Sequence, residues 1–348
     1  MITTTAAGRT WHFDRSLGRP TNEHNGTVGG YRHPTDLCIT NDDILFVLSR
    51  GHNSQTGTPD NGRIGKTTFE EHHLGDFARQ EFTWPAGIAL DSDGWVYVSD
   101  EFENIIRKFD PDKTLPYPDA DPDNEAVAKW GSTGTDEGML NGPSGIHFDS
   151  EDTLFVVDSR NDRVQQFTKD GEFLSSFGHS GTGHGEFSRP WGITIDNNGD
   201  IYIADWGNHR VQKFSPEGKF LMTFGTEFGG ELNNPANVAV DSEGDVYVTD
   251  WGNRRVQVYE PTGDVLTAFY GDATSLSKAG EYIIRRDPGT IKAYRQVKDY
   301  TEMGRFMRPT GIEIDKNNHI IVADSCGRLQ VYAKDSGYVE PEVKLELE

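Results

Sequence analysis

The chain has 348 residues, of which 34% are hydrophobic and 39 are glycines, and its formal net charge is −23 at pH 7. A surface this acidic argues against nonspecific binding to nucleic acid or to an anionic membrane, because both favour basic proteins. The sequence has no apolar run long enough to span a bilayer, and residues 1–9 lack the apolar core of a signal peptide. Its two cysteines make no disulfide framework, so we expect a cytoplasmic protein.

The first predicted element is a short aromatic strand at residues 10–14, which stands apart from the patterns that follow it. From residue 31 to residue 332 one spacing recurs six times: a proline, a marker residue six positions later and a second marker nine positions after that. Both markers are aspartates in five copies and are Thr40 and Ser49 in the first copy. The prolines that open the copies are Pro34, Pro85, Pro143, Pro190, Pro235 and Pro309.

Each copy is predicted to form four short strands. In residues 189–225 hydrophobic residues alternate with polar ones, and turn residues at 197–200 and 215–218 separate the runs. Four antiparallel strands per repeat are typical of a propeller blade. Because blades must cover one another's faces, we expect six of them to close into a ring, so that residues 1–340 form one all-β domain.

The longest departure from the repeat is an insertion at residues 271–306, between the fifth and sixth blades. Ser275 or Ser277 is suited to cap a helix that ends near residue 286, and Pro288 is suited to begin a second one. We expect this helical pair to lie over the mouth of the central channel as a lid. A cover over an exposed blade edge is the alternative.

The sixth copy supplies only three clear strands before the charged tail at residues 341–348. We therefore expect the strand at residues 10–14 to pair as the outer strand of the last blade. This pairing would tie the two ends of the chain together.

The repeat pattern P-x-G-[IV]-x-x-D, followed by [IV]-Y-[IV]-x-D-x-x-N-x-R-[VI]-Q, resembles the NHL repeat. The likeness is greatest in residues 190–214 and 235–259, and it extends over nearly the whole chain. It implies a six-bladed NHL propeller, most like the stand-alone bacterial type. That family includes peptidyl-hydroxyglycine amidating lyases, RNA-binding propellers and partner-binding propellers, so the fold alone does not fix the function.

The amidating lyases carry an arginine–glycine pair after an apolar strand of their first blade, and Arg50-Gly51 resembles that pair. The resemblance makes Arg50 a candidate catalytic and substrate-binding residue. The zinc histidines of those enzymes directly follow the prolines that open the blades, where this chain has other residues. Their zinc site and reaction are therefore not transferred to this chain, which has Ala86, Ser144, Trp191, Ala236 and Thr310 at those positions.

In a propeller, the loops between second and third strands lie on the same side of the ring as the loops that lead into the next blade. We call this side the rim. Three irregular segments converge on the rim where blades 6 and 1 meet: the loop at residues 49–62, the short connection at 324–328 and the insertion. Regular repeats need no such exceptions, so their clustering indicates a specialised site.

Arginines, tryptophans and histidines are the candidate functional residues of the rim. Guanidinium groups would hold an anion, unless they are solvated or paired internally. Tryptophans would form an aromatic collar or pack between blades. A neutral imidazole would bind a divalent metal or move a proton. The substrate-binding candidates are Arg32, Arg160, Arg189, Trp206, Trp251 and Arg308; the catalytic candidates are Arg50 and His52; the metal candidates are His33, His52 and His209.

The aspartate that ends the second strand of five blades has two interpretations. Carboxylates around one channel would suit a hard cation. Their recurrence instead favours a structural role, in which each accepts hydrogen bonds from loop amides and pairs with an arginine of its own repeat, such as Arg163, Arg210 or Arg255.

Two functions follow from these candidates. In the first, the channel mouth binds a small anionic molecule for a lyase or hydrolase step, with Arg50 and Arg308 holding the anion and His52 moving a proton. A Cys326–His52 nucleophilic pair is a variant of this function. In the second, a noncatalytic scaffold docks a protein partner on its rim. For both we expect a monomer or a small homo-oligomer that binds neither nucleic acid nor membrane.

Overall fold

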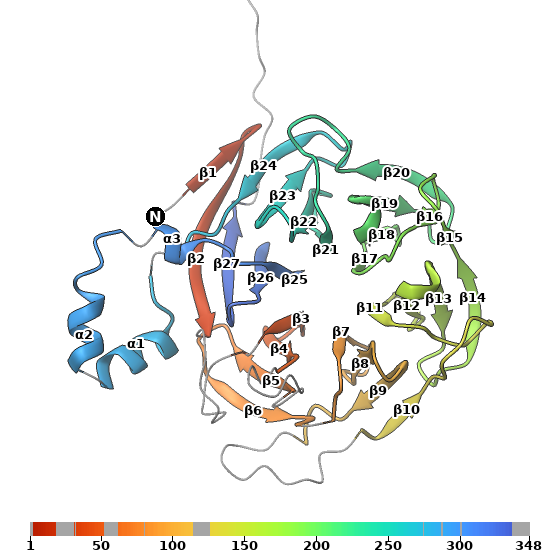
Figure 1. The fold of residues 1–348 in the computed structure, drawn as a ribbon, viewed down its shortest axis with the longest axis horizontal. Helices are drawn as coiled ribbons and strands as arrows, with labels where there is room; N and C mark the ends of the chain where they lie inside the picture. The colour runs from red at the N-terminus through yellow and green to blue at the C-terminus, as the bar shows by residue number, and fades with distance from the viewer. Residues whose placement is uncertain are drawn as a thin grey trace, which may run out of the picture.

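The computed structural model describes residues 3–18, 31, 33–51, 62–79, 81–113, 126–273, 275–286, 288–299 and 301–335. Six antiparallel sheets stand around a central axis, each with its first strand innermost (Figure 1). This arrangement confirms the six-bladed, all-β propeller predicted from the repeats. Arg32, His52 and the tail at 341–348 lie outside the described residues.

The blades follow the chain in order around the ring. Blade 1 consists of β3 (Pro34–Ile39), β4 (Ile44–Ser49), β5 (Arg63–Thr68) and β6 (His73–Phe77). Blade 2 consists of β7 (Pro85–Leu90), β8 (Val96–Asp100), β9 (Ile105–Phe109) and β10 (Ala128–Trp130). Blade 3 consists of β11 (Pro143–Phe148), β12 (Leu154–Asp158), β13 (Arg163–Phe167) and β14 (Phe173–Phe177).

The second half of the ring repeats this plan. A short parallel pair, β15 (His179–Ser180) and β16 (Glu186–Phe187), precedes blade 4. Blade 4 consists of β17 (Ile193–Ile195), β18 (Ile201–Asp205), β19 (Arg210–Phe214) and β20 (Phe220–Phe224). Blade 5 consists of β21 (Pro235–Val240), β22 (Val246–Asp250), β23 (Arg255–Tyr259) and β24 (Val265–Phe269). Blade 6 begins with β25 (Pro309–Ile314), β26 (His319–Asp324) and β27 (Arg328–Lys334).

The N-terminal segment completes blade 6. Strand β2 (Arg9–Gly18) pairs antiparallel with β27, and β1 (Thr3–Ala6) adds a fifth strand outside it. The strand expected at residues 10–14 is therefore confirmed, and it lies within the longer strand β2. Trp11 is buried, and its Nε1 donates a 2.8 Å hydrogen bond to the hydroxyl of Tyr247 in blade 5. Both ends of the described chain are thus fixed in the same sheet.

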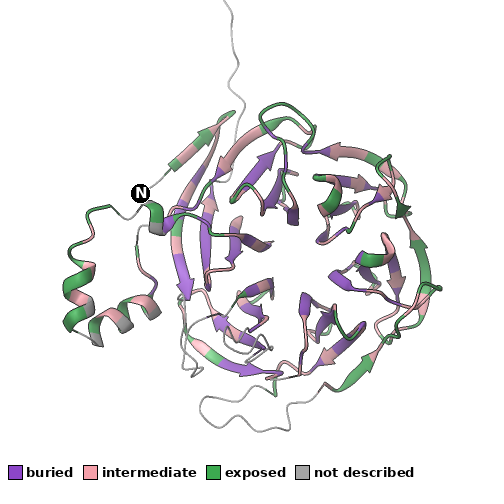
Figure 2. Ribbon diagram, in the orientation of Figure 1, coloured by how far each residue is buried: buried purple, intermediate pink, exposed green. Residues whose placement is uncertain are grey.

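The core is divided into layers between neighbouring sheets. Between blades 6 and 1, for example, Leu45 and Val47 of β4 pack against Ile321 and Ala323 of β26. Figure 2 shows buried residues concentrated on the inner and middle strands, with more exposed residues on the outer ones. The alternation of hydrophobic and polar residues reflects this layering, because each strand contributes to the layers on both faces of its sheet.

The first aspartate of each repeat holds the hairpin turn between the first two strands. Asp241 Oδ1 accepts hydrogen bonds from the backbone N–H groups of Glu243 and Asp245, at 2.9 and 3.0 Å. In blade 1, where the repeat has threonine instead, Thr40 Oγ1 accepts from the N–H of Ile44 at 3.1 Å. This turn function explains the spacing of the marker residues. Equivalent bonds are made by Asp91, Asp149, Asp196 and Asp315.

The insertion forms α1 (Lys278–Arg286), α2 (Pro288–Tyr294) and a short α3 (Thr301–Gly304). Ser277 caps α1 by accepting the N–H of Gly280 at 3.0 Å, which confirms one of the two expected caps. The helices lie outside the ring beside β2, not over the channel (Figure 1). The expected lid is therefore wrong. The connection leaves from β24, the outermost strand of blade 5, and α1 packs on the outer side of blade 6.

The described part of the chain contains no helix that is long and apolar enough to cross a lipid bilayer.

Candidate functional site

The rim loops of consecutive blades are joined by hydrogen bonds. Within blade 4, the N–H of Gly207 donates to Ser188 O at 2.7 Å, which joins the loop after β18 to the loop that leads into the blade. Between blades 4 and 5, the N–H of Asn234 donates to His209 Nδ1 at 3.0 Å. The prediction that these two sets of loops share one side of the ring is confirmed.

The recurrent aspartates are buried structural residues of this rim. Asp205 is fully buried; its Oδ1 accepts from the N–H of Ser188 at 2.8 Å, and its Oδ2 accepts from Arg210 Nε at 2.9 Å. Burial raises the pKa of Asp205, and these hydrogen bonds oppose the shift. The structural interpretation is confirmed. The equivalent pairs are Asp100 with Arg107, Asp158 with Arg163, Asp250 with Arg255 and Asp324 with Arg328.

Arg50 belongs to a compact cluster formed by blades 1, 2 and 3. Its guanidinium lies over the ring of Trp84 at 4.4 Å, and its Nε donates to Pro85 O at 3.3 Å. Glu101 lies between two guanidinium groups, 3.6 Å from Arg50 and 2.9 Å from Arg160. Burial lowers the pKa of Arg50 to about 10, and the charge of Glu101 opposes this shift. Arg50 is therefore still a cation at neutral pH, with a carboxylate already beside it.

A second group of rim residues spans blades 4 to 6, and we call it the tryptophan arc: Trp191, Trp206, Trp251 and Arg308. The ring centroids of Trp191 and Trp206 are 6.0 Å apart, and those of Trp206 and Trp251 are 5.1 Å apart. The guanidinium of Arg308 lies 3.6 Å from the ring centroid of Trp251. Beside it, Met307 is 56% exposed. The fold therefore brings three predicted site residues, Trp206, Trp251 and Arg308, into one continuous surface.

The rim also carries cations without acidic partners. Among the residues that the structure describes, Arg189, Arg254 and Arg308 make no ion pair, whereas the arginines of the repeat pattern do. The side chain of Arg189 is exposed, and its backbone N–H donates to Asp162 Oδ1 at 2.7 Å. These guanidinium groups provide positive charge to the same side of the ring as the tryptophan arc, and Arg308 is itself part of the arc.

The histidine candidates do not form a metal site in the described part of the chain. The Nδ1 of His209 accepts the hydrogen bond from Asn234, which places the ring proton of a neutral imidazole on Nε2. His33 is exposed, and its backbone carbonyl accepts from the N–H of Arg50 at 3.1 Å. No group of three or more His, Cys, Asp or Glu side chains is arranged to hold a metal ion among the described residues.

Cys326 is not poised as a nucleophile. Its Sγ donates to Asp324 Oδ2 at 3.0 Å, and burial, together with the charge of Asp324, raises the pKa of this thiol to about 12. The thiol is therefore protonated at neutral pH, whereas thiol chemistry needs the thiolate. The Cys326–His52 pair stays a prediction, because His52 lies outside the described residues.

The sequence interpretation missed Glu101 and Trp84 as partners of Arg50, and it missed Asp36 and Asn237 at the inner ends of blades 1 and 5. For Asp36 and Asn237 the sequence does contain a signal. The pattern P-x-G is kept in four copies, but it becomes Pro34-Thr35-Asp36 in the first and Pro235-Ala236-Asn237 in the fifth. A polar side chain in place of a glycine at the channel indicates a specific local role.

Comparisons with known proteins agree with the fold. The NHL repeat family model matches residues 187–214 and 232–259, in blades 4 and 5. No curated protein sequence matches the chain. A streptogramin B lyase structure superposes with a TM-score of 0.57 at 12% identity, covering 95% of this chain and 100% of that one.

Two further structures show the same likeness of fold. Virginiamycin B lyase from Staphylococcus aureus, in a catalytically inactive form with quinupristin, has a TM-score of 0.52 at 16% identity, covering 89% of this chain and 82% of that one. A chain of the nidogen/laminin complex has a TM-score of 0.52 at 18% identity, with coverages of 77% and 92%. The repeats, the ring of six sheets and these matches together identify the chain as a six-bladed β-propeller that carries NHL repeats.

Proposed function

We propose that this propeller is a noncatalytic recognition module that docks a protein partner on the tryptophan arc. The observation that carries the proposal is the stacking of Arg308 on Trp251, which continues through Trp206 to Trp191. Tryptophan and arginine contribute most of the binding energy in many protein interfaces, because they present large, rigid contact surfaces.

The chemistry of the arc indicates what the partner presents. The indole rings and Met307 suit an apolar or aromatic side chain. The guanidinium groups of Arg189, Arg254 and Arg308 suit carboxylates at its edge. On a chain with a net charge of −23 such a patch of unpaired cations is selective, because the rest of the surface repels acidic partners. One of the structural relatives comes from a nidogen/laminin complex, which agrees with a binding role.

Alanine substitution tests this function. In Trp206→Ala and Trp251→Ala, we expect loss of the partner that copurifies with the native protein, with binding weakened at least about tenfold each. Leu221→Ala is the matched control, since Leu221 is an exposed apolar residue of the outer strand β20. Retention of every partner by both tryptophan variants would refute the proposal.

A lyase or hydrolase step on a small anionic substrate is the second candidate. The likeness to streptogramin B lyase and the position of Arg50 beside Glu101 favour it. Its test is turnover of small anionic esters by the native protein, Arg50→Ala and His52→Ala, with quinupristin, the ligand of the structural relative, as a separate substrate. Absence of turnover by the native protein would rule out this candidate for these substrates, and equal turnover by all three proteins would show that Arg50 and His52 are not the catalytic residues.

A further inference from the structure

The two ends of the helical insertion are joined to each other and to blade 6. The N–H of Phe306 donates to Tyr270 O at 2.9 Å, and the side chain of Phe306 is buried in the layer between blades 5 and 6. Gln330 of β27 fastens both ends of the insertion: its Nε2 donates to Gly304 O at 2.9 Å, and its Oε1 accepts from the N–H of Asp272 at 2.8 Å. These contacts fasten the two ends of the insertion to each other and to β27, so the helices between them are an addition to the ring.

The inner side of this addition is held against the ring. Ser277 Oγ donates to Gly18 O at the end of β2. Lys278 Nζ forms a 3.0 Å ion pair with Glu70 and donates to its backbone carbonyl at 2.8 Å. These contacts orient α1, and α2 packs on α1 farther from the ring (Figure 1). The insertion therefore projects from the ring in a fixed orientation.

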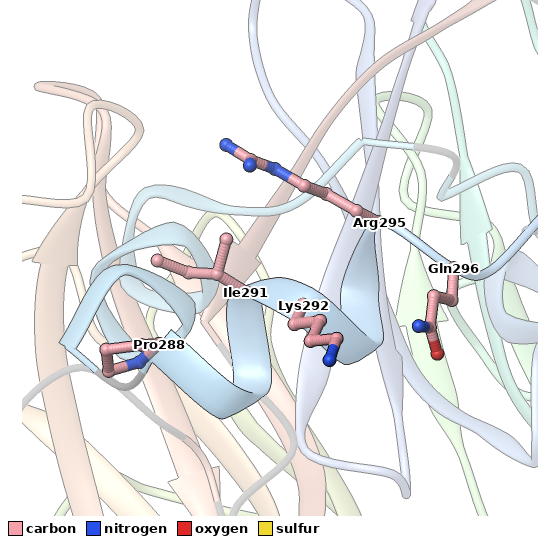
Figure 3. Close-up of a pocket in the computed structure, with 5 residues that line it drawn as sticks. All are labelled: Pro288, Ile291, Lys292, Arg295 and Gln296. Atoms are coloured by element: carbon pink, nitrogen blue, oxygen red, sulfur yellow. The ribbon is translucent and has the colours of Figure 1, made fainter.

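The outer part of the insertion contains an open hollow of about 460 Å³ on α2 and the turn that follows it. Its lining combines apolar and cationic side chains (Figure 3): Pro288, Ile291, Lys292, Arg295 and Gln296. Ile291 and Arg295 are four positions apart and point to the same side of α2 in Figure 3, as helical spacing requires. The apolar side chain of Ile291 thus lies beside the guanidinium group of Arg295 in the hollow.

The charge of the insertion is opposite to that of the rest of the molecule. Residues 271–306 contain seven Lys and Arg against five Asp and Glu, which gives the insertion a net charge of +2. Because the whole chain has a net charge of −23, the residues outside the insertion have a net charge of −25. Most cations of the ring are paired, but among the described residues Lys292, Arg295 and Lys298 make no ion pair. At physiological ionic strength charges act over about 8 Å, so a ligand that touches only the insertion encounters a basic surface.

We propose that α2 and the turn after it form a docking surface for an acidic segment of a partner protein. An apolar side chain of that segment occupies the hollow against Pro288 and Ile291, and its carboxylates pair with Lys292 and Arg295. A second copy of the chain fits less well, because two bodies of net charge −23 repel each other. This surface is separate from the tryptophan arc and does not depend on the function proposed for it.

Fluorescence anisotropy of the full chain with a labelled acidic peptide tests this proposal. The probe is a peptide with one leucine flanked on each side by two glutamates. We expect saturable binding that weakens as salt rises, and a loss of at least about tenfold in the Lys292→Glu/Arg295→Glu variant. A Lys292→Gln/Arg295→Gln variant with unchanged helical circular dichroism separates loss of charge from unfolding, and it should also bind more weakly.

The control variant reverses two other exposed lysines, Lys113→Glu/Lys219→Glu, which lie on turns of blades 2 and 4. It changes the net charge equally, so its affinity should stay near that of the native protein. Ile291→Ser should weaken binding of the leucine peptide but not of a peptide with serine in its place. Equal affinity of the insertion and control variants, competition by inorganic phosphate or anionic phosphatidylserine vesicles alone, or a peptide-independent dimer in sedimentation would overturn the proposal.

Discussion

The carboxylate of Asp36 accepts a 3.0 Å hydrogen bond from the side-chain amide of Asn237, which joins blade 1 to blade 5 across the inner end of blade 6. The other oxygen of Asp36 accepts from the N–H of Ile88 in blade 2 at 3.1 Å. Blade 6 is the sheet built from both ends of the described chain. This bond therefore spans the one blade whose strands are not continuous in sequence.

Asp36 and Asn237 each stand where the other four repeats have the glycine of the P-x-G pattern. The innermost strands approach so closely at this level that a β-carbon on Gly311 would lie 2.6 Å from the Cα of Asp36, and one on Gly145 would lie 2.6 Å from Trp191 O. Side chains are tolerated at this position only in blades 1 and 5, where they reach each other. The exceptions to the repeat thus compensate for each other.

A double-mutant cycle should show that Asp36 and Asn237 act as a pair. Asp36→Gly and Asn237→Gly restore the residue that the other four blades carry, so both variants should fold. We expect each to lower the melting temperature by about 2–4 °C, and the double variant to lose clearly less than the sum of the two, because the bond can be lost only once. Strictly additive losses, measured by calorimetry, would show that the bond contributes nothing.

A partly buried acid next to this pair, Glu313, should make stability depend on pH. Burial raises the pKa of Glu313 to about 8, and the charge of Asp36 adds to the shift. Between the usual glutamate pKa and pH 8 the folded state binds more protons than the unfolded state, so the free energy of unfolding falls as pH rises through this window. We expect Glu313→Gln to match the native protein at pH 4 and to be more stable than it above pH 8. Urea unfolding at several pH values measures this, and a pH-independent difference would contradict it.

The repeat made much of the fold predictable, but it gave little information about what the irregular segments contact. The spacing of proline and aspartate reports turns and strand ends, which are local, so the blades were predicted correctly. The cap of α1 is also local, and Ser277 was one of the two residues expected for it. Strand pairing across the ends also followed, because blade 6 lacked a strand. The position of α1 depends on contacts with residues far away in the sequence, such as those of Ser277 with Gly18 and of Lys278 with Glu70, and helical periodicity does not contain that information. Partners such as Trp84 for Arg50 likewise come from different blades.

Closure of the ring should depend on Trp11. This side chain is buried between blades 5 and 6, contacts Phe269 with ring centroids 5.9 Å apart, and donates to the hydroxyl of Tyr247. We expect Trp11→Ala to cost about 3–5 kcal/mol in the free energy of unfolding, because it leaves a cavity and removes the hydrogen bond that the hydroxyl of Tyr247 accepts, although this hydroxyl still donates to Asp241. Hydrogen exchange should increase first in β2 and β27. As a control, Phe228→Ala removes an exposed aromatic side chain and should change neither quantity.

The side of the ring opposite the rim contains a buried ion cluster that should respond sharply to substitution. Lys334 Nζ lies 2.6 Å from Asp241, 2.8 Å from Glu243 and 2.8 Å from Asp245, and its side chain is fully buried.

Lys334→Met keeps the shape of the side chain but leaves the buried carboxylate of Asp241 without its cation, whereas Asp245 keeps Arg9 at 2.7 Å. We therefore expect a loss of about 3–5 kcal/mol, measured by denaturant unfolding at neutral pH. Lys316→Met is the matched control, because Lys316 is about half exposed and lies 3.5 Å from Asp43, and it should cost less than about 1 kcal/mol. Lowering the pH toward 4 should narrow the gap in the free energy of unfolding between the Lys334 variant and the native protein, because burial raises the pKa of Asp245 and its protonation removes part of the charge that the lysine balances. A gap that persists unchanged at pH 4 would mean that packing of the lysine chain, and not its charge, holds blades 5 and 6 together.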